Sequence, residues 1–293
     1  RGAGGPGGDR SDFRSGPAQH SRRAHFGGHH SPGGRAVAGG GGAGGSARRT
    51  SGTPGTTIDG GGGAGGAYAK TNISVISGEQ YTVVVGAGGV APNTTTFVDG
   101  SRNDGADSWF SNSVIVLTLA KGGAGGENKN TVGSAAGTRG TCPSGSIGDV
   151  VFLGGSGADG ATTPASGGGG GSGGTNSVGN SATGIAGATA VGGGGAGANG
   201  RTTTGTGNTP TGIGGGGSGA QSGSTTQQQG GSGAAGKVAI TYATPAPTYT
   251  WVAISGTNDW TVPASWSPIR TTPTISDVLM FTNGGSSTAT NVP

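Results

Sequence analysis

The sequence predicts a mostly β and irregular fold with almost no helix, in which a small β-sheet frames a bundle of extended glycine segments. Three observations predict it. Gly makes up 75 of 293 residues, about four times the usual share of ~7 %. Short runs of β-branched and aromatic residues interrupt the glycine and are typical of strands. Finally, glycine tracts recur between loops rich in Thr, Ser, Asn and Ala.

The first fifty residues form a basic block that we separate from the rest of the chain. They hold eight Arg and all four His against two Asp, a net charge of +6, whereas residues 51–293 carry −2. One interpretation is a disordered arginine- and glycine-rich arm of the kind that binds nucleic acid. The other is a sequence artefact, because GC-rich DNA read out of frame yields Gly, Arg, Pro, Ala and His. We expect no metal at the four His, since no scaffold supports one.

A domain is predicted over residues 51–244, and its strands come first. Residues 68–76 alternate in polarity, residues 77–80 predict a turn, and residues 81–85 are β-branched and aromatic. We interpret this stretch as a hairpin. Residues 113–119 (SVIVLTL) predict a third strand.

Residues 100–110 predict a polar loop that ends in two aromatic residues. Arg102, Asp104, Trp109 and Phe110 are candidates for a contact loop. For the two aromatic side chains the favoured interpretation is nevertheless that they cover the small core, as large apolar side chains usually do.

Glycine tracts fill the rest of this domain, at residues 154–157, 167–174, 192–197, 214–219 and 230–233. Such a run is a poor helix and a poor ordinary strand. It can adopt the polyproline II helix, which has three residues per turn and no internal hydrogen bonds. Each N–H must then bond to a neighbouring tract. We therefore favour a bundle of glycine helices over a flexible linker.

The chain ends in a second module. Residues 237–244 (KVAITYAT) predict a closing strand, residues 245–247 (PAP) a linker, and residues 248–293 the start of a β-rich module. This module holds three of the four Trp and little glycine, and we expect its VLMF run to be a buried strand.

The run GGGGAGGAYAKTNISVISGEQYTVVVGAGG, together with the closing GGSGAAGKVAITYA, resembles the glycine-rich domain of bacterial surface proteins and phage tail-tip adhesins. The resemblance covers about residues 60–243. It implies a bundle of polyglycine helices whose tip loops contact a receptor. Residues 31–45 depart from the family pattern, because they keep the first glycine tract and lack the Trp- and Val-rich strand expected before it.

The C-terminal sequence GTNDWTVPASWSPIRTTPTISDVLMFTNGGSSTATNVP resembles the opening of the Trp-Ser-Pro repeats in large secreted surface proteins of Bacteroidetes. This resemblance implies an extracellular protein of which the present chain is a part.

Catalytic chemistry is not indicated. Residues 51–293 contain no His, so a Ser-His-Asp triad is excluded there. Strings like GxGxxG are expected by chance in so glycine-rich a chain, and no βαβ unit follows them. We expect no cofactor, no metal site and no membrane span, because no apolar run reaches the ~18 residues that one needs. Asn72 and Asn93 fit the glycosylation pattern.

The expected function is that of a non-enzymatic structural protein at the cell surface or outside the cell, either an adhesin or a filament subunit. Its partners would be further copies of itself, in an oligomer or fibre, or cell-surface glycans or a receptor. Unpaired strand edges are templates for such assembly, and the candidate assembly positions are Tyr81, Val83, Val85, Val114 and Val116. The alternative is a phage tail-tip adhesin. Ice binding and nucleic-acid binding are less favoured.

Overall fold

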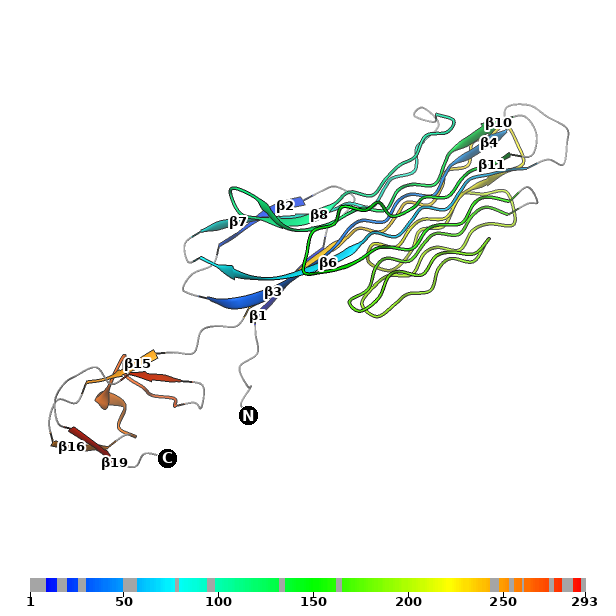
Figure 1. Cartoon of the computed structure of the whole chain (residues 1–293). Coiled ribbons are helices and arrows are strands. Elements are labelled where there is room, and N and C mark those ends of the chain that lie inside the picture. The colour runs from blue at the N-terminus through cyan, green and yellow to red at the C-terminus, as the bar shows by residue number, and fades with distance from the viewer. Residues whose placement is uncertain are drawn as a thin grey trace. The chain divides into compact units, whose positions relative to one another are not determined.

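The computed structural model describes two compact units, residues 1–243 and residues 244–293, which we treat separately (Figure 1). The described residues are 9–14, 20–25, 30–49, 57–76, 79–93, 98–131, 135–161, 165–242, 248–252, 256–259, 261–273, 277–280 and 287–290. These residues contain no α-helix and one short 3-10 turn, Pro263–Ser265. The expected mostly β and irregular fold is confirmed.

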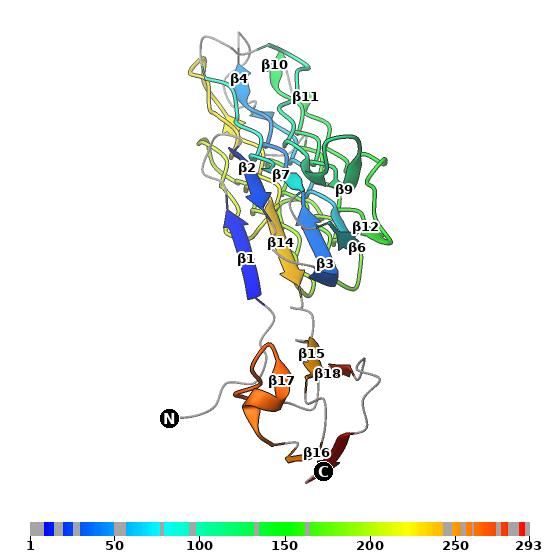
Figure 2. The same ribbon diagram turned by 90° about the vertical axis from the view of Figure 1, so that its left-hand side faces the viewer.

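Two antiparallel sheets form one end of the first unit (Figures 1 and 2). One has the strand order β1-β14-β3-β6-β12 and the other β2-β7-β8-β9. The strands are β1 Asp9–Arg14, β2 His20–His25, β3 His30–Ala38, β6 Tyr68–Val75, β7 Gln80–Val85, β8 Ser108–Ser111, β9 Val116–Ala120, β12 Val150–Phe152 and β14 Lys237–Tyr242.

The main apolar core lies between these two sheets. It takes side chains from both, among them Val37 and Val238 from the five-stranded sheet and Val83 and Phe110 from the four-stranded sheet. Phe110 is fully buried, and its ring stacks on that of Tyr81 at 5.2 Å between centroids. Alternation along each strand places these residues on one face, so the sheets pack as a small sandwich.

The predicted hairpin is wrong, although both of its strands exist. β6 pairs with β3 and β12 in one sheet, whereas β7 pairs with β2 and β8 in the other. The physical reason is burial. Val75 on β6 and Val83 on β7 both belong to the core between the two sheets, and burial of apolar side chains there favours strands that face each other across the sandwich. Of the predicted turn, residues 77–78 lie outside the described residues.

Glycine tracts continue the strands away from the sandwich. β3 runs directly into residues 39–46, residues 60–67 lead into β6, and β9 runs into residues 121–128. The tracts lie side by side along the length of the first unit (Figure 1). Without a Cβ, these segments approach more closely than strands with side chains can.

The hydrogen bonds of residues 39–47 repeat every three residues. Gly39, Gly42 and Gly45 donate their N–H groups to the carbonyls of residues 67, 64 and 61, at 2.8–2.9 Å. Gly40 and Ala43 donate to residues 106 and 103, and Gly41, Gly44 and Ala47 donate to residues 234, 231 and 228. Successive N–H groups thus point in three directions in turn, as expected for a helix with three residues per turn.

The carbonyls of the same tract bind three further neighbours. Residues 123, 126 and 129 donate to carbonyls 40, 43 and 46, residues 217 and 220 donate to carbonyls 42 and 45, and Gly89 donates to carbonyl 41. The tract therefore has six neighbours. Residues 60–67 are surrounded in the same way, with three neighbours accepting from their N–H groups and three donating to their carbonyls. The predicted bundle is confirmed for the described tracts, and a flexible linker is excluded for them.

This packing requires glycine. A Cβ placed on Gly62 would lie 1.9 Å from the carbonyl oxygen of Gly168, and one on Gly44 would lie 1.8 Å from that of Ser218. Both contacts are with backbone, which cannot move aside as a flexible side chain can. Gly192, at the surface, is different, because a Cβ there would meet nothing closer than 3.5 Å.

The structure also differs from the predicted start of the domain. Residues 30–49 belong to the domain, because β3 lies inside a sheet and residues 39–46 lie inside the bundle, so the domain does not begin at residue 51. β3 is the strand thought to be missing before the first tract. The rest of the predicted arm is described only at β1 and β2, which are also paired strands.

Residues 100–110 do not form the predicted loop. Asn103 and Ala106 accept hydrogen bonds from the tract of residues 39–47, and Ser108–Ser111 forms β8. The predicted strand at residues 113–119 begins later, at Val116, because residues 112–115 form the turn between β8 and β9.

Short strands close the other end of the first unit (Figure 1). β4 Ala47–Arg49 pairs with β10 Lys129–Thr131, and β5 Ile58–Asp59 pairs with β11 Ala135–Ala136 and β13 Gln221–Ser222. We call this the distal end. Ala47, Ile58 and Ala220 form a second, small core near it.

The second unit has a core of its own. β15 Thr248–Trp251 pairs with β17 Trp266–Ser267 and with β18 Val278–Met280, and β16 Gly256–Asp259 pairs with β19 Ser287–Thr290. Tyr249, Trp251 and Trp266 are buried together. Val278–Met280 of the VLMF run form β18, but Val278 and Met280 are 48 % and 43 % exposed, so the expectation of a buried strand is wrong for these residues. The predicted linker 245–247 lies outside the described residues.

Candidate functional site

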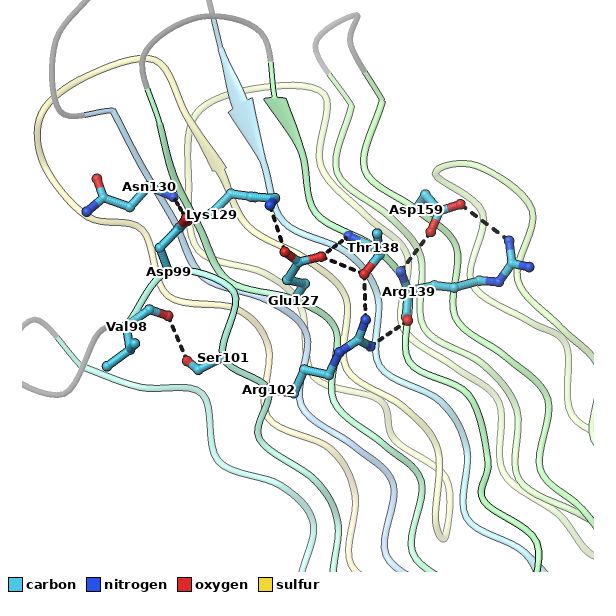
Figure 3. Close-up of polar contacts among 10 residues, drawn as sticks. All are labelled: Val98, Asp99, Ser101, Arg102, Glu127, Lys129, Asn130, Thr138, Arg139 and Asp159. Carbon is cyan, nitrogen blue, oxygen red and sulfur yellow. Dashed lines mark hydrogen bonds and ion pairs between the residues drawn. The ribbon is translucent and has the colours of Figure 1, made fainter.

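A network of charged and polar side chains crosses the bundle near the distal end (Figure 3). Arg102 lies at its centre. Its guanidinium donates to the carbonyl of Gly125 at 3.0 Å, to the carbonyl of Arg139 at 2.6 Å and to the hydroxyl of Thr138. Asp104 accepts from the N–H of Gly125 at 2.7 Å. Arg102 and Asp104 thus bind the carbonyl and the N–H of the same residue, Gly125, and so fix neighbouring tracts to each other.

Glu127 extends this network. Its carboxylate accepts from Lys129 Nζ at 2.6 Å and from both the N–H and the hydroxyl of Thr138. Burial alone would raise the pKa of Glu127, but the hydrogen bonds from Lys129 and Thr138 outweigh burial and lower the pKa to about 2. The group is therefore ionised in solution at neutral pH, and its charge is already matched inside the chain.

Two further carboxylates complete the row. Asp159 accepts from the N–H of Arg139 at 2.7 Å and pairs with its guanidinium at 3.3 Å, with both side chains half exposed. Asp99 accepts from the N–H of Asn130. Since these groups bind one another and the backbone, the network joins tracts and presents few unsatisfied groups to a ligand.

The predicted contact loop is therefore wrong as a loop. Arg102 and Asp104 are tract-joining side chains, Trp109 is half-buried, and Phe110 is completely buried in the sandwich. The favoured interpretation of Phe110 as core is confirmed. The network itself was missed because its partners, Glu127, Thr138 and Arg139, come from separate tracts whose neighbourhood no local pattern reveals.

A buried carboxyl lies at the distal end. Asp59 on β5 is fully buried, and it accepts from Gln221 Nε2 at 2.9 Å and from the Thr57 hydroxyl at 3.2 Å. Burial raises the pKa of Asp59 to about 6, and the hydrogen bonds from Gln221 and Thr57 limit the rise. Its hydrogen bond with Gln221 on β13 links two strands that are far apart in sequence.

The candidate assembly positions divide into two groups. Tyr81, Val83 and Val85 are buried on β7, and β7 is paired on both sides. It offers no free edge, so this part of the prediction is wrong. Val114 and Val116 are 82 % and 40 % exposed, at the turn and the start of β9.

The exposed turn between β8 and β9 is well defined. The Asn112 side-chain oxygen accepts the N–H groups of Val114 and Ile115 at 3.0 and 2.8 Å. Both apolar side chains thus project from a fixed turn, and each remains more than half exposed.

Segment 147–153 was not predicted as part of the sandwich. Ile147 exchanges backbone hydrogen bonds with Leu119 on β9, and β12 then pairs with β6 of the other sheet. The segment thus closes one side of the sandwich, with Ile147, Val150 and Leu153 partly exposed. The apolar run VVFL was the available signal.

The other candidate groups lie at the surface or against the core. Asn72 on β6 and Asn93 are exposed, as glycosylation would require. Cys142 is half-buried and packs against the main core, and burial raises the pKa of its thiol. Among the described residues no three His, Cys, Asp or Glu side chains are grouped so as to hold a metal ion. Nor does any described helix have the length and hydrophobicity needed to cross a membrane.

Comparison with known proteins agrees with the architecture. A family model described as a glycine-rich domain matches residues 34–243, which is well over half of the chain and nearly all of the first unit. No curated protein matches the chain. The match includes the tract of residues 39–47 and ends just after β14. Because it covers more than half of the chain, the chain belongs to the glycine-rich domain family.

Proposed function

We propose that this protein is a non-enzymatic structural protein of the extracellular space or cell surface, an adhesin or filament subunit in which the glycine bundle is a rigid spacer. The observation that carries the proposal is the six-neighbour packing of tracts 39–47 and 60–67. A body whose interior is hydrogen-bonded backbone resists bending in every direction across its section.

The surface of the bundle supports this role. Its loops are rich in Thr, Ser and Asn, and several of its charged side chains, such as Glu127 and Asp159, are paired within the chain. Such a surface is polar but has little net charge, which suits a spacer exposed to solvent. Exposed Asn72 and Asn93 are compatible with a sugar coat.

Self-association is the second part of the proposal. The outer strands are β1 and β12 in one sheet and β2 in the other, and open strand edges are sites where another chain can add a strand. A receptor-binding tip has less support, because the residues assigned to its contact loop lie in the bundle and the core.

Electron microscopy of the purified full chain tests the proposal. We expect fibres or end-to-end rods that lengthen with protein concentration, and antibody labelling of intact cells of the source. The matched variants are Gly62→Ala, which places a Cβ against backbone, and Gly192→Ala, which has room for one. Only the first should abolish the rods. A monodisperse monomer at every concentration, with no surface label, would contradict the proposal.

A further inference from the structure

Two strands of the sandwich lie outside the glycine-rich domain as the family defines it. The family match begins at residue 34, whereas β1 and β2 span residues 9–14 and 20–25. β1 adds an outer strand to β14, and β2 adds an outer strand to β7. The N-terminal segment therefore extends both sheets of a domain that begins after it.

Without this segment the domain would have two exposed apolar edges. The sheets would then end at β14 and β7, which lie close to each other across the sandwich. Val238 and Ile240 on β14, and Tyr81 and Val83 on β7, belong to the buried core. Edges of this kind pair readily with any matching strand, so a chain that keeps them must cover them.

The chain has a weak point where the segment joins the domain. The pairing of β3 with β6 shifts register between His30 and Gly33. Gly33 and Gly34 follow Pro32 at this irregularity. An interrupted ladder leaves fewer hydrogen bonds to break there. The family match begins at the same place.

We propose that β1 and β2 are an exchangeable pair of strands, which cover β14 and β7 of their own chain in the monomer and of a second copy in the assembly. The partner is thus a second copy of this chain, which offers its β14 and β7, and the hinge lies at the register shift between His30 and Gly33. This proposal rests on the assembly role proposed above and names its contact.

The energetics favour exchange at high local concentration. The same hydrogen bonds and the same register form in either state, so the free energies differ mainly by the hinge conformation and by the entropy of association. The donated segment and the accepting edges are different surfaces. Their contact is therefore heterologous, and it can propagate from copy to copy as a filament requires.

Disulfide trapping in the full chain tests this contact. Arg10 on β1 is the register partner of Thr241 on β14, and Thr241 is exposed. One chain carries Arg10→Cys and the other Thr241→Cys, both with Cys142→Ser to remove the native thiol. The two chains are co-expressed with different tags, oxidised, and separated without reductant. A disulfide between the two differently tagged chains forms only if β1 of one chain lies on β14 of the other.

We expect a heterodimer band at least about tenfold stronger than in a control that pairs Arg10→Cys with Val178→Cys. Val178 is exposed and lies outside every described strand. If only the chain carrying both Arg10→Cys and Thr241→Cys forms a disulfide, and only within itself, exchange is excluded. Fibres without the intermolecular disulfide would leave the proposed function standing and overturn the exchange. The disulfide without fibres would do the reverse.

Discussion

At the scale of single residues, the interior of the bundle depends on the absence of side chains. Nearly every glycine of residues 39–45 and 60–66 would place a Cβ within 3 Å of backbone atoms of another tract. The alanines within them, such as Ala43 and Ala64, are fully buried, and so they occupy the few positions where a methyl group fits. Substitutions therefore separate into two classes according to the space at each position.

Gly62→Ala should be severely destabilising. The added Cβ would meet the Gly168 carbonyl at 1.9 Å, so two tracts must separate and lose hydrogen bonds, at a cost of more than about 3 kcal/mol. Gly192→Ala is the control and should change stability by less than about 1 kcal/mol. Chemical denaturation measures both, and equal effects would show that the bundle is not close-packed in solution.

Asp59→Asn should stabilise the protein at neutral pH. Because the pKa of Asp59 is raised to about 6 in the folded state, stability is greatest below the unfolded value of about 4. It falls as the pH rises to about 6 and stays reduced above that. The loss is on the order of 3 kcal/mol. Melting temperatures from pH 3.5 to 7 should slope downward in the parent and less so in the variant. The same slope in both would contradict the assignment.

Glu127→Gln should act at the acidic end. The folded pKa of Glu127 is lowered to about 2, so the parent's stability is present above the unfolded value, 4.5, and is lost as the pH falls toward 2. The variant should melt at a lower temperature than the parent at pH 5 and approach it near pH 2. Glu79→Gln, which removes a negative charge outside this network, controls for a general effect of charge removal.

At the scale of elements, the sandwich supplies the side-chain core that the tracts lack. Four of its strands were visible in the sequence, because β-branched and aromatic runs mark β6, β7, β9 and β14. Their pairing was not, since β6 and β7 bond to strands from distant parts of the chain. Strand pairing is decided by which apolar faces can be buried together, and adjacent strands in sequence are only one option.

Phe110→Ala should lower stability by about 3–5 kcal/mol, as loss of a large buried aromatic side chain usually does. It should also reduce hydrogen-exchange protection in residues 39–46, because β3 and β8 hold the starts of several tracts. Trp109→Ala, on the opposite face of the same strand and only half-buried, is the control. Unchanged protection in the tracts after Phe110→Ala would mean that the bundle orders independently of the sandwich.

The sequence predicts that the tracts form a bundle, but it does not predict which tract lies beside which. Residue composition determines that a glycine run must bond laterally. Which run lies beside which depends on loops that have no strong pattern, so the network of Arg102, Glu127 and Thr138 could not be foreseen. Arg102 resembled a contact residue in a polar loop, whereas its acceptors lie on residues 125, 138 and 139.

At the scale of the whole molecule, the two units have separate cores. The boundary near residue 244 was predictable from the change in composition at Pro245 and Pro247. The start of the first unit was not, because the basic, histidine-containing sequence before residue 34 hides β1 and β2. Their strand character comes from pairing with β14 and β7, not from local propensity.

A chain ending at residue 243 should keep the melting temperature of the first unit within a few degrees, because residues 244–293 bury their aromatic side chains among themselves. Differential scanning calorimetry of the full chain should show two transitions, of which the shortened chain retains one. A single cooperative transition that is lost on shortening would show that the units depend on each other.

The three-residue repeat of hydrogen bonds in residues 39–47 limits how such a protein can change its length over evolution. One extra residue in a tract would turn every following N–H by a third of a revolution, away from its acceptor. Three extra residues restore the phase and lengthen the tract by about 9 Å. Members of the family should therefore differ in the length of facing tracts by whole turns, that is, by multiples of three residues.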